Sequence, residues 1–182
     1  MKRGTIERIF NYFYKSNKYR NEIRRALVVF FGDRNIKIDE TAEGLFNEWL
    51  LYDFKMLNNR SFLEEYVMTN PENLIDKNLK IYKGFLDNKF GIFEVIKIQK
   101  GESLKVIDLQ SGVEYIINEK TATQHLKRGN VFIGRIGRVE GCYELVGANP
   151  IFLNSTINQQ FRQAVPQKTQ FDPLIVWQVL NA

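Results

Sequence analysis

The feature that most constrains the fold is a series of short alternating apolar and polar stretches between positions 91 and 147. Alternation with a period of two is typical of β-strands, and the Gly, Ser and Asn residues between the stretches favour turns. We therefore expect five strands, at residues 92–98, 104–109, 113–118, 131–139 and 142–146. Strands of this length and spacing favour a small five-stranded antiparallel β-barrel, either SH3-like or OB-like.

Helical patterns precede this β-unit. Residues 5–15 and 20–31 place apolar side chains three and four positions apart, which indicates two amphipathic helices. Aspartate is a common helix N-cap, so Asp39 predicts a third helix from Glu40 to about Met56.

Two further helix starts follow. Ser61 and Glu64 match the capping box, in which each side chain accepts a hydrogen bond from the other residue's backbone, and they predict a helix to about Met68. Pro71 after Asn70 predicts the start of another helix, because a proline in the first turn loses no hydrogen bond. We expect that helix to continue to the edge of the β-unit.

The C-terminal region has two helical patterns. Residues 154–170 are rich in Gln and Asn and predict a weak amphipathic helix, whereas Asp172 and Pro173 predict the start of a final, strongly apolar helix. Large exposed apolar patches are uncommon, so we expect this last helix to dock on its own chain. The alternative is an interface for a partner, formed by Ile175, Trp177 and Leu180.

The predicted fold class is therefore α+β, with an N-terminal helical region packed on the barrel and a C-terminal helical tail. The expected divisions are residues 1–88 for the helical region, 91–147 for the barrel and 148–182 for the tail. The alternative is that all three form one compact domain.

Charge is distributed unevenly along the chain, whose net charge is +5. Residues 1–37 carry ten basic and three acidic side chains, a net charge of +7, while the other 16 basic and 18 acidic side chains give −2. Clustered Lys and Arg with interleaved aromatic residues are typical of nucleic-acid binding. The candidate phosphate-binding residues are Arg8, Lys15, Lys18, Arg20, Arg24 and Arg25 near the N-terminus, and Lys127, Arg128, Arg135 and Arg138 on the barrel.

Catalytic patterns are weak. Nucleophilic catalysis needs a nucleophile beside a base, but His125 lies in a polar connection and Cys142 in a strand, so a packed thiol and a surface imidazole are the plainer interpretation. Acidic residues in the β-unit, Glu94, Asp108, Glu114 and Glu119, are ordinary on exposed strands and turns, and Asp108 is expected to brace a turn. We expect no catalytic residues, no metal and no cofactor.

Several short blocks in order resemble an uncharacterised bacterial family. The blocks are residues 45–53, 61–66, 91–95, 106–115, 126–130 and 133–136. In that family a helix with the pattern F-x-x-W-x-x-x-D, matched here by Phe46, Trp49 and Asp53, and a second short helix precede a small barrel. Some members append a zinc motif called SEC-C, which this chain lacks. The resemblance implies a fold and no activity, and Phe46 and Trp49 are expected to be core residues.

The favoured function is a non-enzymatic binding or adaptor module with an unknown partner. The alternative is RNA or DNA binding through the basic N-terminal helices. One cysteine and no long apolar run favour a cytoplasmic protein that uses no membrane and contacts either a protein or a nucleic acid. The oligomeric state stays open.

Overall fold

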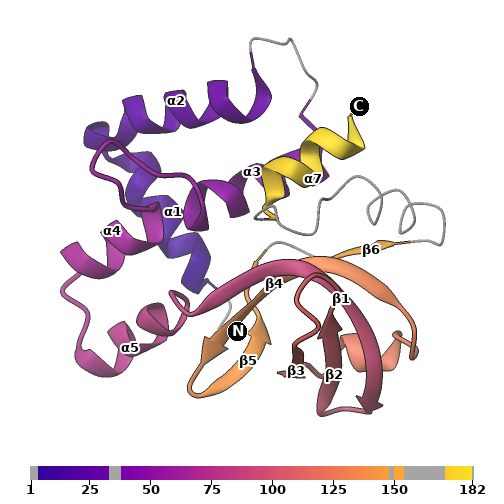
Figure 1. The fold of residues 1–182 in the computed structure, drawn as a ribbon. Helices are drawn as coiled ribbons and strands as arrows, with labels where there is room; N and C mark the ends of the chain where they lie inside the picture. The colour runs from indigo at the N-terminus through magenta and orange to yellow at the C-terminus, as the bar shows by residue number, and fades with distance from the viewer. Residues whose placement is uncertain (1–3, 33–37, 148–149, 154–170, 182) are drawn as a thin grey trace.

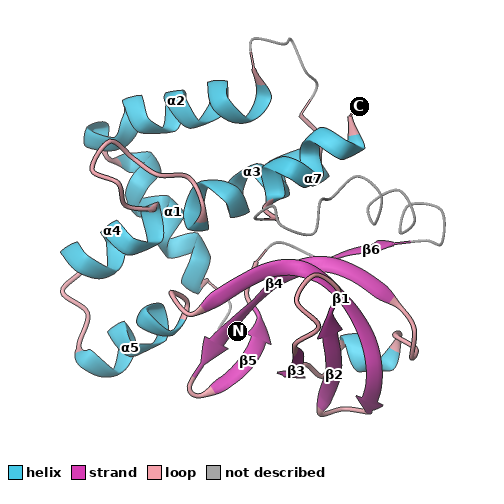
Figure 2. Ribbon diagram, viewed as in Figure 1, coloured by secondary structure: helices cyan, strands magenta, loops and turns pink. Residues whose placement is uncertain are grey.

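The structure is a computed structural model, and it describes residues 4–32, 38–147, 150–153 and 171–181. Helices gather on one side of the molecule and a mixed six-stranded sheet lies on the other (Figures 1 and 2). The α+β class is thereby confirmed. The helix expected within residues 154–170 lies outside the described residues.

The helical elements follow the predicted order. They are α1 (Thr5–Lys15), η1 (Asn17–Tyr19), α2 (Arg20–Phe31), α3 (Glu40–Tyr52), α4 (Phe62–Thr69), α5 (Asp76–Gly84) and α7 (Pro173–Leu180). The Asp39 carboxylate accepts a hydrogen bond from the Ala42 N–H at 2.8 Å, and both halves of the Ser61–Glu64 capping box are present. Local capping chemistry therefore identifies the starts of α3 and α4 correctly.

One predicted helix start is wrong. The helix expected to begin at Pro71 begins at Asp76 instead. Asn70 ends α4 with φ of 39°, and its side chain accepts from the Leu74 N–H and donates to the Leu74 carbonyl oxygen. Asn tolerates this left-handed conformation, so the segment is a turn and delays the next helix.

The sheet contains one strand more than expected. Its strands are β1 (Asn88–Gln99), β2 (Ser103–Asp108), β3 (Glu114–Asn118), β4 (Val131–Val139), β5 (Cys142–Leu145) and β6 (Ile151–Leu153). A short helix, η2 (Ala122–Gln124), lies in the polar connection between β3 and β4. The expectation of an entirely antiparallel sheet is wrong, because β3 and β5 pair in parallel.

The strand order is β1-β2-β3-β5-β4-β6, and β1 also pairs with β4. The pairings of the first five strands therefore return to their starting point. Strand β1 can serve both neighbours because it is long and because its register with β2 shifts between Val95 and Lys97. Such an irregularity bends a strand and increases its twist.

The two faces of this sheet contribute to two cores. Inside the curve of the sheet, Phe93 and Phe132 lie 5.5 Å apart between ring centres, both fully buried. The neighbouring Ile92 and Ile133 point the other way and join the core shared with the helices. Because side chains alternate along a strand, β1 and β4 serve both cores at once.

The C-terminal helix docks on its own chain, as expected. Val176 is fully buried, and the Trp177 ring lies 6.1 Å from the Phe30 ring and 5.5 Å from the Phe31 ring. Trp177 is thus half-buried and packs on α2, while its part in a partner interface stays a prediction. Of its proposed companions, Ile175 is half-buried and Leu180 is 41% exposed.

Candidate functional site

Arg135 lies buried between β4 and α3, which corrects its assignment to a basic surface patch. The residue is 3% exposed. Its Nε donates to Glu48 Oε1 at 2.9 Å, and its terminal nitrogens contact the side chains of Asp53 and Asn88. A guanidinium with two carboxylate partners and an amide partner is not available to a phosphate group.

Aromatic rings enclose this charge cluster. The Arg135 guanidinium carbon lies 4.4 Å from the centre of the Tyr52 ring and 5.2 Å from that of Phe90. The Tyr52 hydroxyl donates to the carbonyl oxygen of Val146, the residue that follows β5, at 2.9 Å. The cluster therefore joins the helical side of the molecule to the sheet through both charge and ring contacts.

Burial also changes the electrostatics of the carboxylates. Burial raises the pKa of Asp53, while the neighbouring Arg135 guanidinium lowers it less strongly. Burial likewise raises the pKa of Asp172, the N-cap of α7, whose carboxylate also senses Arg135. The Arg135 guanidinium is shared by the carboxylates of Glu48 and Asp53, so the chemistry of this cluster is that of a structural clamp.

One feature of the sequence indicates that Arg135 is buried, although it belongs to no recognised motif. Arg135 stands among apolar and glycine residues in Val131–Gly137, all of which are buried. A lone arginine within such a strand predicts a buried, paired charge better than a surface one. Asp53 closes the F-x-x-W-x-x-x-D pattern, and Phe46 and Trp49 are core residues, as expected.

Three of the six candidate phosphate-binding residues near the N-terminus have acidic partners. Arg8 lies 3.6 Å from Glu72, Lys18 lies 3.4 Å from Glu65, and Arg25 lies 2.7 Å from Glu22. Arg25 also donates to the Lys55 carbonyl oxygen and lies 4.4 Å from the Phe54 ring centre. These contacts reduce the positive potential that the sequence predicts for the N-terminal helices.

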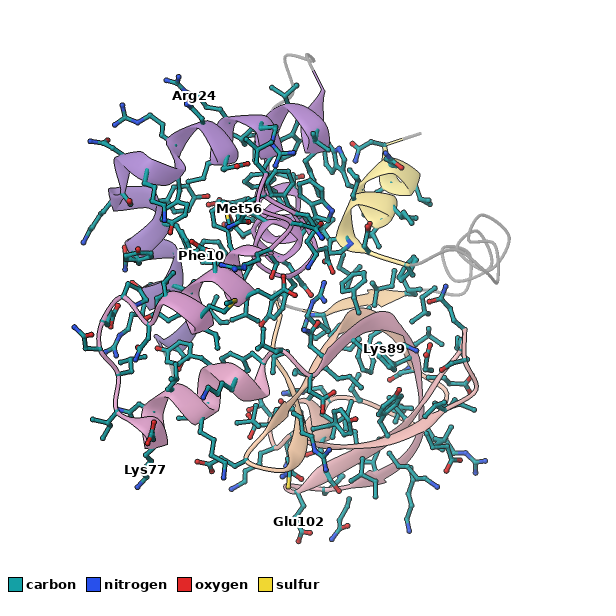
Figure 3. The ribbon with its side chains drawn as sticks, turned by 60° about the vertical axis from the view of Figure 1, so that its left-hand side comes forward. Phe10, Arg24, Met56, Lys77, Lys89 and Glu102 are labelled. Carbon is teal, nitrogen blue, oxygen red and sulfur yellow. The ribbon has the colours of Figure 1, made fainter. Side chains whose placement is uncertain are left out.

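Three cations of this set remain without carboxylate partners among the described residues: Lys15, Arg20 and Arg24. The Arg20 Nη2 donates a hydrogen bond to Asn17 Oδ1 at 2.6 Å. Arg24 extends outward from α2 (Figure 3). The aromatic residues between them are mostly used in packing, because Tyr19 is buried and only Tyr14 is more than half exposed.

Apolar side chains continue the outer face of α2. Leu27, Val28 and Val29 are 36%, 56% and 50% exposed. The opposite face of this helix is buried through Ile23, Ala26 and Phe30. The outer face of α2, which we define as Arg20, Arg24, Leu27, Val28 and Val29, thus combines positive charge with exposed apolar surface.

The basic residues of the sheet region lie elsewhere. Lys127 and Arg128 are exposed in the turn that follows η2, and Arg138 is exposed 3.8 Å from Asp87. Figure 1 places the β3–β4 connection on the side of the molecule away from α2. The predicted phosphate-binding residues therefore do not form one continuous surface.

Among the residues considered for catalysis, Cys142 is exposed, so the expectation of a packed thiol is wrong, and His125 is exposed, as expected. The acidic residues have structural partners. Asp108 braces the β2–β3 turn, as expected, by accepting from the Gln110 N–H and the Ser111 hydroxyl. Its pKa is lowered: burial alone would raise it, but hydrogen bonds from Lys89, Ser111 and Gln110 outweigh burial. Lys89 is marked in Figure 3.

Other acidic residues are similarly engaged. Glu114 pairs with Lys105 at 2.5 Å, and the Glu119 carboxylate accepts from the Thr121 and Ala122 N–H groups. Within the described ranges, no group of three His, Cys, Asp or Glu residues is arranged to hold a metal ion. Over the same residues, no helix is long and apolar enough to cross a membrane.

Together, the fold and these surfaces define a small α+β protein with a buried charge clamp and an exposed basic and apolar helix face. The chain belongs to a family of unknown function (DUF7986), whose model matches residues 2–171. This agrees with the expectation of an uncharacterised family. No curated protein and no solved structure matches the chain.

Proposed function

We propose that the chain is a non-enzymatic binding module that docks a protein partner on the outer face of α2. The observation that carries this proposal is the exposure of Leu27 and Val28, which follow Arg24 by three and four positions and so lie beside it on the helix. Exposed apolar groups rimmed by charge mark interaction sites, and Arg is enriched in protein interfaces. The complementary partner surface combines apolar with acidic side chains.

The position of α2 suits this role. Its inner face is packed through Ile23 and Phe30, and Phe30 and Phe31 meet Trp177 of the docked C-terminal helix. A surface presented on a rigid element loses little conformational freedom when it binds. The aromatic packing below α2 therefore favours a preformed docking face.

We also propose that the sheet is a small OB-like barrel that acts here mainly as a scaffold. The return of the pairing from β4 to β1, with β5 inserted beside β3, supports Greek-key order over a simple meander. OB folds often bind single strands on the β2–β3 face through stacked aromatic rings. On this face the described exposed residues include Ile116 and a Lys105–Glu114 pair, which suit that mode poorly.

Nucleic-acid binding is the second candidate. Lys15, Arg20 and Arg24 are exposed and have no carboxylate partner among the described residues, which favours contact with phosphate. The acidic partners of Arg8, Lys18 and Arg25 argue against a strong site. We therefore rank this function below protein docking.

The family assignment supports a relation to the bacterial group with the F-x-x-W-x-x-x-D helix. We propose this relation, including the link to members with a SEC-C motif, from the sequence blocks given above. A cytoplasmic location is part of the same proposal.

A photo-crosslinking residue at position 28 tests the docking proposal inside cells that produce the full chain. The matched control carries the same residue at Val113, which is 47% exposed in the connection between β2 and β3. We expect a discrete protein adduct only at position 28, lost with Arg24→Glu and kept with Lys77→Glu on α5. Identical adducts at both positions, or none at position 28, would contradict the proposal.

A salt series with labelled random single-stranded RNA and duplex DNA separates the two candidates. Phosphate contact makes affinity fall steeply as salt rises. If nucleic acid is the partner, the triple change Lys15→Glu, Arg20→Glu and Arg24→Glu abolishes binding while Val28→Ser leaves it unchanged. If a protein is the partner, Leu27→Ser weakens the adduct formed at position 28, and nucleic-acid binding is absent at low salt.

A further inference from the structure

A groove of about 620 Å³ lies between β6 and η2, away from the outer face of α2. Its walls are mainly apolar, and Glu119, Thr121, His125 and Asn130 add polar groups to the lining. The apolar lining comes from Ala122, Leu126, Val131, Leu145, Phe152 and Leu153. A concave apolar surface with few polar groups is the usual form of a binding site.

One wall of this groove is the edge of the sheet. Among the described residues, β6 pairs with β4 and with no other strand. An edge strand has unpaired N–H and C=O groups that can pair with another chain. The direction in which the N–H and C=O groups of β6 point follows from the hydrogen bonds between β4 and β1.

The alternation of antiparallel hydrogen bonds fixes that orientation. The Val95 N–H donates to the Asn130 carbonyl oxygen at 2.9 Å, so residues 95 and 130 form a hydrogen-bonded pair. Every second pair along β1 and β4 is then hydrogen-bonded, which includes Phe93 with Phe132. The main-chain groups of Phe132 therefore point toward β1 and away from β6.

Phe152 lies opposite Phe132 in the β4–β6 ladder. Since Phe132 points toward β1, these two residues form a non-hydrogen-bonded pair, and the Phe152 N–H and C=O point to the free edge. The side chain of Phe152 is 53% exposed, and its ring lies 6.1 Å from that of Phe132. The edge thus presents one donor and one acceptor beside an apolar groove.

The segment that forms one wall of the groove, residues 119–130, has a net positive charge, although its one acidic residue, Glu119, is itself part of the lining. Residues 119–130 carry Lys120, Lys127 and Arg128 against a single acidic residue, Glu119. The Glu119 carboxylate is already occupied by the N–H groups at the start of η2. Charge complementarity therefore favours a ligand with acidic residues.

We propose that this groove binds an extended peptide of a partner protein, which adds as a strand to the free edge of β6. Its alternate apolar side chains enter the groove, and its acidic residues face Lys127 and Arg128. In strand addition, main-chain hydrogen bonds supply affinity and side-chain pockets supply specificity. This site is independent of the docking face on α2.

Selection from a display library of random twelve-residue peptides on the immobilised full chain tests the proposal. We expect enriched peptides with alternate apolar residues and acidic flanks. N-methylation at successive positions of one such peptide should weaken binding at every second residue, since only alternate N–H groups face β6. Failure to enrich any peptide, or equal tolerance of N-methylation at all positions, would overturn it.

Matched variants of the chain locate the site. Phe152→Pro removes the outward N–H, which an edge strand tolerates, and should weaken binding about tenfold relative to Phe152→Val, as expected for one lost hydrogen bond. The double change Lys127→Glu and Arg128→Glu should weaken binding more than Lys77→Glu. Arg24→Glu should have no effect, so the α2 proposal can fail while this one stands. Equal affinity of the proline and valine variants would contradict strand addition at β6.

Discussion

Arg135 and Arg24 are the same residue type in opposite surroundings. Arg135 is 3% exposed and bonded to two carboxylates, whereas Arg24 extends from the outer face of α2 and has no carboxylate partner among the described residues. The sequence predicts a phosphate contact for both. Their difference teaches that burial and partners, and not residue type, decide whether a cation holds the fold together or is available for binding.

The largest expected effect comes from removing the buried cation. Arg135→Met leaves Glu48 and Asp53 buried without their shared partner, and we expect a loss of about 3–5 kcal/mol in the free energy of unfolding. Urea unfolding followed by tryptophan fluorescence measures this loss. The matched control is the triple variant Glu48→Gln, Asp53→Asn and Arg135→Met, which removes all charges and should be more stable than the single variant. Equal instability of the two would contradict an electrostatic role.

The next largest loss of stability is expected at Gly147, whose backbone lies close to the Glu48 carboxylate. A Cβ at Gly147 would lie 2.3 Å from Glu48 Oε1, so Gly147→Ala must displace a carboxylate of the clamp. We expect a cost of about 1–3 kcal/mol, as for other overpacked sites. Gly134→Ala is the control, because its nearest neighbours are at an ordinary 3.6 Å. A similar cost for both variants in thermal unfolding would exclude a specific role for Gly147.

The pH dependence of stability should differ in sign between two buried carboxylates. Burial raises the pKa of Asp53 in the folded state. The contribution of Asp53 to stability therefore falls as the pH rises from the ordinary pKa of an aspartate to the raised pKa of the folded state. Lys89 and the hydrogen bonds that Asp108 accepts lower the pKa of Asp108. The contribution of Asp108 to stability is therefore lost as the pH falls below the ordinary pKa of an aspartate.

Urea unfolding between pH 3 and pH 7 checks both signs. Asp53→Asn should remove part of the decrease in stability at rising pH, and Asp108→Asn should remove part of the decrease at falling pH. Parallel profiles for the two variants would show that their environments do not differ as the structure indicates.

The smallest effects are expected on the outer side of α2. Arg24→Ala should change stability by less than about 0.5 kcal/mol, because an exposed cation without a partner contributes little. Arg25→Ala should cost up to about 1 kcal/mol, since Arg25 contacts Glu22 and the Phe54 ring. Chemical denaturation of both variants measures these losses in the free energy of unfolding, which should be much smaller than the loss for Arg135→Met. A large loss of stability for Arg24→Ala would contradict the exposed, unpaired position of this side chain among the described residues.

Much of the fold could be predicted because local rules govern it. The caps at Asp39, Ser61 and Asp172 locate three helix starts, and alternation of apolar residues locates five of the strands. Strand β6 was missed because three residues after a proline give too short a pattern to recognise. The helix expected at Pro71 was misplaced because the Asn70 side chain stabilises a turn instead.

The sites were less predictable because they depend on contacts between distant positions. Glu48, Asp53 and Arg135 meet across more than 80 positions of the sequence. Neither their spacing nor their residue types reveal the pairing. The exposed face of α2 was partly visible as Arg20 and Arg24, but the exposure of Leu27, Val28 and Val29 depends on which face of the helix α3 and α7 cover.

The sequence by itself determined the α+β class, most element boundaries and the uneven distribution of charge, since these depend on neighbours within a few positions. Only the tertiary structure decided the parallel pairing of β3 with β5, the docking of Trp177 on Phe30 and Phe31, and the burial of Arg135. The physical reason is that burial and strand pairing are properties of the assembled chain. A charge becomes structural only when packing removes it from water and supplies its partners.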